Sequence, residues 1–259
     1  EFAPERVLNH MMQHILNNDA DIDYIFPLDA DEFIYCPSRE KLNAFLTLIP
    51  QNRVGMYTWR GYLPHSTEYD PDFIFHFTDQ RKEEILTPKV IIPRTIAETC
   101  ILTIGSHSVR DKEGKEVQSI VFIGSNNQQF YYWFINRFNA EFIETNDLWL
   151  GHYPIRSTIQ QIKKVLEKSI TMVMEKKGYR DSAWENQLRD LLAHNLDISL
   201  DELRLIAYNY RASDEKQIQI ACQQPLRSTK LALKYQHLIN NDPLPVLAKL
   251  ILDLAEKLR

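Results

Sequence analysis

The apolar residues of this chain change their spacing near residue 157, and this change limits what the chain can fold into. Between residue 54 and about residue 125, short apolar runs typical of β-strands follow one another. Beyond Ser157 the apolar residues recur every three or four positions, which is typical of amphipathic helices. The sequence therefore predicts an α/β core over residues 1–157, followed by an all-helical C-terminal region over residues 158–259.

Individual elements can be placed within this outline. Ser38 has the chemistry of a helix N-cap, and residues 111–116 have the composition of a hairpin turn. The expected strands are 24–28, 54–59, 73–77, 89–92, 99–104 and 119–123. The expected helices are 4–18, 41–49, 159–170, 184–194, 200–208, 244–258 and, with a strand as the alternative, 127–144.

Two aspartates separated by one residue follow the first expected strand. The apolar run 24–28 ends in Asp29-Ala30-Asp31, and Glu32 comes next. Carboxylates that follow a buried strand call for a counter-charge, and a hard divalent cation such as Mg²⁺ or Mn²⁺ is the simplest one. A plain turn after a strand is the alternative, because Asp is common in turns.

Composition excludes several classes of protein. The chain has 259 residues and a formal net charge of -5, which argues against nucleic acid as its main partner because such binding depends on basic surfaces. Its 7 glycines form no Gly-rich phosphate loop. Cys36, Cys100 and Cys222 are widely spaced and indicate free thiols in a reducing compartment. No apolar run reaches the length of a membrane span, so we expect a cytoplasmic protein without a transmembrane segment.

A second polar cluster lies where the spacing changes. His152 follows Gly151 and precedes Pro154, which constrains its backbone, and Arg156 stands at the start of an expected helix. Arg offers a rigid fork for phosphate oxygens, and a helix N-terminus adds backbone N–H donors. A His and an Arg at such a corner are typical of the surroundings of a metal-bound diphosphate.

Taken together, the two clusters resemble a known family. Residues 28–33 (Leu-Asp-Ala-Asp-Glu-Phe) and 152–157 (His-Tyr-Pro-Ile-Arg-Ser) are similar to the signatures of GT-A fold glycosyltransferases, in the bacterial branch close to family 2. Residues 57–62, residues 89–94 and His107 are weaker landmarks between them. The resemblance covers roughly residues 1–175. It implies a GT-A-like, partly Rossmann-like mixed sheet flanked by helices.

The resemblance also implies an activity. A sugar would pass from a nucleotide-sugar donor to a hydroxyl of a saccharide or lipid-linked acceptor, with inversion, in polysaccharide biosynthesis. The protein would be cytoplasmic or peripheral to the inner face of the membrane. The implied ligands of Mn²⁺ or Mg²⁺ are Asp31, Asp29 and His152. The residues implied to contact the sugar-nucleotide are Asp29, Lys89 and Arg156, and Trp59 is implied to contact the acceptor. The candidates for the base that deprotonates the acceptor hydroxyl are Asp79, His107, Asp147, Glu83 and Glu84.

One departure from the family pattern supports rival interpretations. Members begin with strands carrying Asn-Glu and Asp-Asn-x-Ser-x-Asp, and neither motif precedes Glu1. The nucleotide-binding strands are therefore expected to be missing, which would leave the isolated chain inactive if it is truncated. The rivals are a non-catalytic interaction module and a metal-dependent phosphatase. In such phosphatases two small residues, such as Gly-Thr, usually follow the second Asp, so Glu32-Phe33 argues against this rival. The apolar stripe of residues 244–258 is expected to pack on the body or on a partner, a second copy included.

Overall fold

In the computed structural model, the residues that can be described are 4–81, 85–103, 107–124, 140–174, 188, 191, 196–210 and 220–222. The chain divides into two compact units. The first consists of residues 1–63, 79–154 and 204–223, and the second of residues 64–78, 155–203 and 224–259. The boundary at 154/155 lies near the change in spacing, but both units are discontinuous in sequence.

The described elements follow one another along the chain in a mixed order. The helices are α1 (Pro4–Asn18), α2 (Arg39–Thr47), α3 (Phe73–His76), α4 (Arg94–Ala97), α6 (Thr158–Met174) and α8 (Leu200–Tyr208). The strands are β1 (Tyr24–Ile25), β2 (Glu32–Tyr35), β3 (Val54–Gly61), β4 (Asp79–Arg81), β5 (Ile85–Pro93), β6 (Ile101–Thr103), β7 (Ser108–Arg110), β8 (Ser119–Ile123), β9 (Ala140–Glu144), β10 (Trp149–His152) and β11 (Ile220–Cys222).

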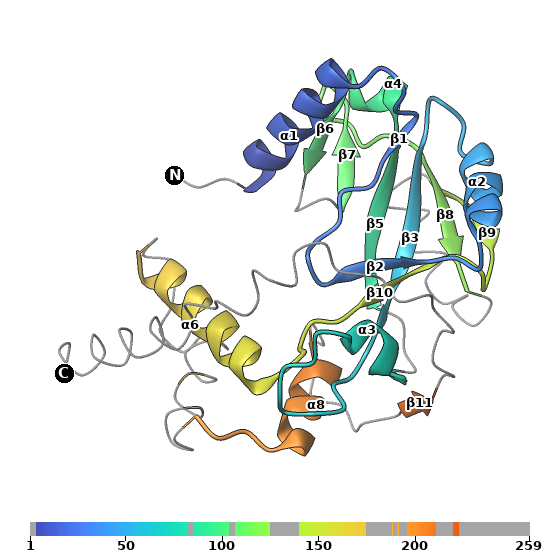
Figure 1. Cartoon of the computed structure of the whole chain (residues 1–259). Coiled ribbons are helices and arrows are strands. Elements are labelled where there is room, and N and C mark those ends of the chain that lie inside the picture. Colours follow the sequence, from blue (N-terminus) through green and yellow to red (C-terminus); the bar gives the residue numbers. More distant parts are fainter. Residues whose placement is uncertain are drawn as a thin grey trace. The chain divides into compact units, whose positions relative to one another are not determined.

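The first unit is built on a seven-stranded mixed sheet (Figure 1). Its long central strand β3 pairs antiparallel with β5 along one edge. Along the other edge, the first half of β3 pairs parallel with β8 and the second half pairs parallel with β10. β9 extends the sheet beyond β8, β1 lies beyond β5, and β2 lies beyond β10. The expected α/β class with a helix-flanked mixed sheet is therefore confirmed.

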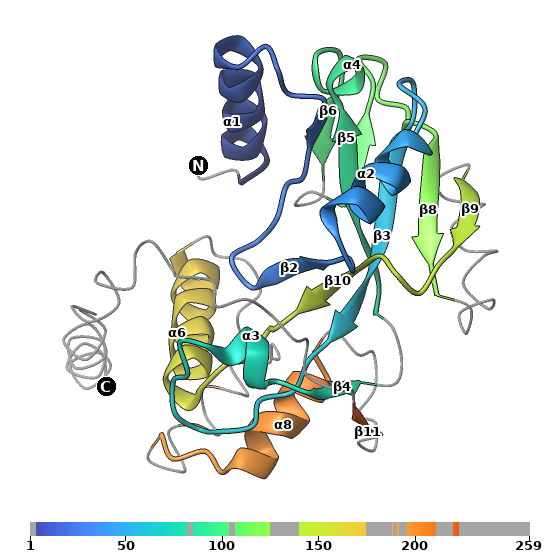
Figure 2. The same cartoon turned by 45° about the vertical axis from the view of Figure 1, so that its right-hand side comes forward.

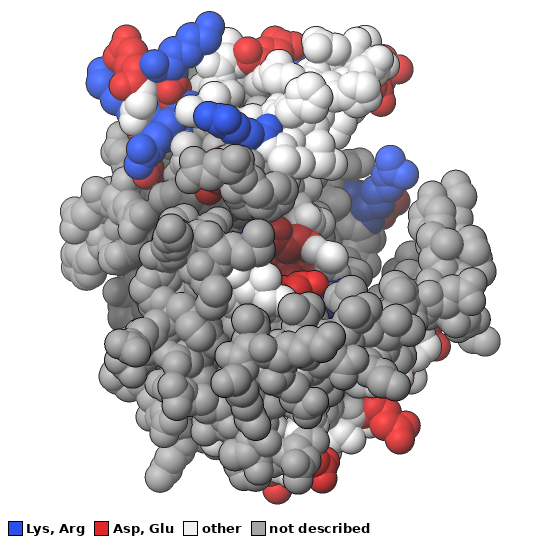
Figure 3. Space-filling model, turned by 90° about the vertical axis from the view of Figure 1, so that its left-hand side faces the viewer, with Lys and Arg blue, Asp and Glu red and all other residues white. Residues whose placement is uncertain are grey.

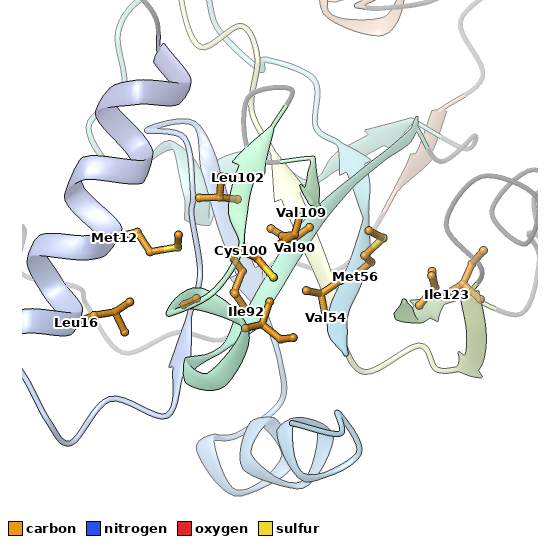
Figure 4. Close-up of a cluster of buried hydrophobic side chains, with 13 residues drawn as sticks. Met12, Leu16, Val54, Met56, Val90, Ile92, Cys100, Leu102, Val109 and Ile123 are labelled. Carbon is orange, nitrogen blue, oxygen red and sulfur yellow. The ribbon is translucent and has the colours of Figure 1, made fainter. Parts of the chain in front are cut away.

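Alternation along the strands builds a hydrophobic core on each face of this sheet. Val54 and Met56 of β3 point to one face, where Met12 of α1 and the hairpin β6–β7 also pack (Figure 4). Tyr57 and Trp59 point to the other face, which α2 covers. Because side chains alternate along a strand, one buried strand serves both cores.

Several expected elements agree with the structure. The helix at 4–18 is α1, the strand at 119–123 is β8, and the helix at 200–208 is α8. The expected strands at 54–59, 89–92 and 99–104 correspond to β3, β5 and β6. Ser38 caps α2, because its side chain accepts a hydrogen bond from the Lys41 N–H at 3.2 Å.

Four expectations are wrong, and the first two have a local cause. The expected strand at 24–28 ends at Ile25, because Pro27 has no N–H to donate to a neighbouring strand. The expected strand at 73–77 is the short helix α3, which a turn around Asp70 initiates. Residues 111–116, by contrast, form the expected hairpin-type turn, which the antiparallel bridge between Arg110 and Glu116 closes.

The other two concern residues for which a helix was expected. In the expected helix 127–144, residues 140–144 form β9, which pairs with β8 and sends Phe142 and Ile143 to opposite cores. The region after residue 157 is not all-helical, because β11 pairs antiparallel with β4. Residues 125–139 and the expected helix 244–258 lie outside the described residues. So does the expected helix 184–194, apart from Leu188 and Leu191, which are helical.

Two further features concern the polarity of the helices and the charge of the surface. Among the described residues, no helix combines the length and the apolar character that crossing a lipid bilayer requires. Where described residues are visible at the top of Figure 3, acidic and basic side chains are interspersed. That part of the surface therefore shows no broad field of one sign.

Candidate functional site

The two aspartates of the Asp-x-Asp motif lie in a hydrogen-bonded turn that leads into β2. The Glu32 N–H donates to the Asp29 carbonyl at 3.0 Å, and the Asp29 N–H donates to Glu32 Oε2 at 2.9 Å. These reciprocal bonds close the turn over residues 29–32. The aspartates are therefore fixed by the start of β2, and not by the end of the strand that precedes them.

Lys89 of β5 supplies the counter-charge for this turn. Its side chain is fully buried, and its Nζ lies 2.8 Å from Asp29 Oδ2 and 3.2 Å from Glu32 Oε2. A buried cation without anionic partners is strongly disfavoured, so Lys89 is held where the two carboxylates are. We call Asp29, Glu32 and Lys89 the turn clamp. Burial also keeps Lys89 away from solvent, so the expected direct contact of its ammonium group with a phosphate does not fit the structure.

Glu32 is the most perturbed carboxyl group of the turn clamp. Burial raises the pKa of Glu32 from 4.5 to about 7, although Lys89 and the hydrogen bond from the Asp29 N–H both favour the ionised form. Its other oxygen, Oε1, is buried and has no hydrogen-bond partner among the described residues. Desolvation therefore outweighs the nearby positive charge. The sequence carried a signal for this clamp, because Glu32 and Lys89 each directly precede an apolar run.

Strand β10 brings His152 to the same turn. It lies between β2 and β3, and His152 is opposite Glu32 in the antiparallel register with β2 (Figure 2). The Tyr153 N–H donates to the Asp31 carbonyl at 2.9 Å. His152 Nε2 lies 3.8 Å from Asp31 Oδ2, and the side chain of Asp31 is 19% exposed. The structure thus brings together the two motifs that lie far apart in the sequence.

Trp59 and His107 support the histidine of this pair. The Trp59 ring stacks on the His152 ring with 4.0 Å between centroids, and the rings of His107 and Trp59 are in a T-shaped arrangement with 5.5 Å between centroids. Trp59 is only 2% exposed. Its ring therefore orients His152, and the expected stacking of Trp59 on an acceptor sugar does not fit its burial. His107 Nδ1 lies 2.8 Å from the Pro88 carbonyl, which can only accept, so Nδ1 carries the proton.

A stack of aromatic rings, which the sequence did not reveal, fixes the strand that carries His152. Tyr153 stacks on Tyr62 at 4.7 Å, Tyr35 stacks on Trp149 at 5.2 Å, and the hydroxyls of Tyr35 and Tyr153 are hydrogen-bonded. Gly151 lets the Tyr35 ring lie against the strand, since an added Cβ would be 2.4 Å from Tyr35 Cε2. Burial raises the pKa of both Tyr35 and Tyr153, which keeps this pair neutral.

The other predicted site residues have different surroundings. Asp79 accepts a hydrogen bond from Arg204, and Asp147 forms an exposed ion pair with Lys41. Glu83 and Glu84 lie outside the described residues.

Arg156 belongs to the second unit, just before α6. There its backbone N–H donates to Gln160 Oε1 at 2.7 Å, and its guanidinium lies 5.2 Å from the centre of the Phe73 ring. The Gln160 N–H donates in turn to Ser157 Oγ at 3.2 Å, so Ser157 is the N-cap of α6. Arg156 thus occupies the helix start that the sequence predicted for it.

Comparison with known proteins adds no assignment: no protein-family model matches the sequence, and no match was found among curated proteins or solved structures. The function must therefore be argued from the residues. In the first unit, the residues that converge are Asp29, Asp31, Glu32, Lys89 and His152, with Trp59 and His107 behind them.

Proposed function

We propose that the first unit carries the sugar-nucleotide site of a metal-dependent glycosyltransferase with a GT-A-like fold. The reaction would move a sugar from a nucleotide-sugar to a hydroxyl of a saccharide or lipid-linked acceptor. The observation that carries the proposal is the 3.8 Å separation of Asp31 Oδ2 and His152 Nε2. These atoms come from the two motifs on which the resemblance to such enzymes rests.

The residues present fit a divalent cation. Ligand atoms lie about 2.1 Å from such an ion, so two ligands of one ion are at most about 4.2 Å apart. Asp31 and His152 meet this limit, and their oxygen and nitrogen atoms suit Mn²⁺. Asp29 gives one oxygen to Lys89, but its side chain is 57% exposed. We therefore assign Asp31 and His152 as metal ligands, with Asp29 contacting the cation or the sugar-nucleotide through its other oxygen.

When bound, the cation would act as a Lewis acid on the charge that develops on the departing diphosphate. The protein's own contribution is to hold its ligands in place before the substrate arrives. The turn clamp fixes the backbone on both sides of Asp31, and Trp59 fixes the ring plane of His152. Lys89 is thus a positioning residue. Such preorganisation avoids a reorganisation cost during the reaction.

An inverting transfer also needs a base for the acceptor hydroxyl. Among the candidates within the described residues, His107 is the one that the ring contacts link to His152, through Trp59. The carboxylates of Asp79 and Asp147 already accept hydrogen bonds from Arg204 and Lys41. We therefore propose His107 as the base.

The test is stabilisation by metal and nucleotide together. Thermal unfolding would be followed with Mn²⁺ alone, with UDP or GDP alone, and with both. At a ligand concentration 100 times the dissociation constant, binding stabilises the folded state by about 2.7 kcal/mol, a rise in Tm of about 5–10 °C. We expect this rise only with metal and nucleotide together.

Matched variants give this test its control. Asp31→Ala should abolish the rise, whereas Asp21→Ala, which removes an exposed carboxylate of the same unit, should retain it. If Asp31→Ala responds as the parent does, the metal assignment is wrong. If the parent itself shows no rise, a non-catalytic interaction module becomes the better proposal.

A further inference from the structure

A second group of metal-binding side chains lies in the second unit, within the segment 64–78. His76 Nδ1 lies 2.7 Å from Asp70 Oδ2, and His65 Nε2 lies 3.5 Å from the same oxygen. One ligand atom from each of the three residues falls within 4.8 Å of the others. The two imidazoles therefore face a single carboxylate.

Local structure holds each of these side chains independently of the others. Asp70 Oδ1 accepts a hydrogen bond from the Asp72 N–H at 2.9 Å, which fixes the carboxylate at the turn that opens α3. Its side chain is only 15% exposed. His76 is the last residue of α3, and the rings of His65 and Phe77 pack in a T-shaped arrangement with 5.1 Å between centroids. The arrangement is thus braced from the backbone and from a buried ring.

Two chemical states suit this geometry. Without a metal, both histidines can donate hydrogen bonds to Asp70, and the cluster is a surface network. With a metal, two imidazole nitrogens and one carboxylate oxygen form a ligand set typical of zinc, which leaves one tetrahedral position for water. The histidine side chains are 41% and 55% exposed, so an ion can reach the cluster from solvent.

We propose that His65, Asp70 and His76 bind one Zn²⁺ ion, with water as the fourth ligand. The ligand set differs from the one around Asp31, because two imidazoles and one carboxylate meet here and one of each meets there. The site would close the loop between His65 and His76. Because the Thr158 N–H donates to the Thr67 carbonyl at 2.9 Å, the closed loop would also be attached to the start of α6.

The test replaces Zn²⁺ by Co²⁺, whose visible absorption is strong when its coordination is tetrahedral. The full chain, freed of metal with a chelator, would be titrated with Co²⁺ and then with Zn²⁺. We expect tetrahedral absorption that saturates at one equivalent and disappears when Zn²⁺ is added. His65→Ala and His76→Ala should each lose this absorption, with unchanged far-UV circular dichroism as the check on folding. Asp70→Asn provides a third variant if either alanine variant misfolds.

Two controls separate this site from others. His10 and His14 are exposed and lie four residues apart on α1, a spacing that can itself bind a divalent ion, so His10→Ala must retain the absorption. Asp31→Ala must also retain it. The proposal is overturned if Co²⁺ gives no tetrahedral absorption, or if His65→Ala and His76→Ala both bind as the parent does. Loss of the absorption in His10→Ala would overturn it equally, by placing the ion on α1.

Discussion

Glu32 gives the turn clamp a measurable pH signature. Its pKa is about 7 in the folded protein and 4.5 as an ordinary side chain. Between these values the folded state holds a proton that the unfolded state has released, so the free energy of unfolding falls as pH rises. The full loss is about 3 kcal/mol, at about 1.36 kcal/mol per pKa unit. Of this, about 2.5 kcal/mol falls between pH 5 and pH 8.

Glu32→Gln isolates this effect. The amide oxygen can still accept from the Asp29 N–H, but the side chain no longer titrates. Loss of the ion pair with Lys89 shifts the whole stability curve of the variant without adding a slope, and every other ionisable group is the same in the two proteins. Urea unfolding at several pH values from 5 to 8 would give the two curves. Relative to the variant, we expect the parent to lose about 2.5 kcal/mol over this range.

A matched carboxylate serves as the control for this experiment. Glu113 lies in the turn after β7 and its side chain is 73% exposed, so Glu113→Gln should follow the parent at every pH. Parallel curves for the parent and Glu32→Gln would refute the reasoning. They would mean that Glu32 is as acidic in the folded protein as in the unfolded chain, and that Lys89 compensates its burial in full.

Three further predictions concern the stability of the first unit. Tyr35→Phe and Tyr153→Phe each remove one buried hydrogen bond and should lower the free energy of unfolding by about 1 kcal/mol or more. Because the two hydroxyls bond to each other, the double variant should lose less than the sum of the two single losses. Additive losses in a double-mutant cycle would contradict this pairing. Gly151→Ala should cost about 1–3 kcal/mol in urea unfolding, because the new Cβ overlaps the buried Tyr35 ring, and a neutral result would contradict this packing. Lys41→Ala should cost less than about 1 kcal/mol, since its ion pair with Asp147 is exposed to solvent, and a larger loss would mean that this pair has a structural role.

Periodicity and capping predicted much of the fold, because these signals are local. The spacing of α1 and the Ser38 cap depend only on neighbours in the sequence, and both agree with the structure. The failures come from contacts between distant segments or from turn chemistry. β9 is a strand because β8 offers its hydrogen-bonding edge, and α3 is a helix because Asp70 initiates a turn.

The same distinction applies to the candidate site. The two motifs indicated Asp31 and His152, which the structure brings within 3.8 Å of each other. The sequence could not reveal that Lys89 is a counter-charge of Asp29, because this pairing depends on how β5 lies in the sheet. Nor could it reveal that Trp59 packs on His152, since this contact depends on the pairing of β3 with β10.

The central claim is that Asp31 and His152 hold one divalent cation. Anomalous diffraction from crystals grown with Mn²⁺ and UDP or GDP would locate the metal without reference to activity. The account predicts a manganese peak within coordination distance of Asp31 and His152 Nε2, with the diphosphate on its open side. Manganese bound anywhere else, or a nucleotide bound without metal near these two side chains, would contradict it.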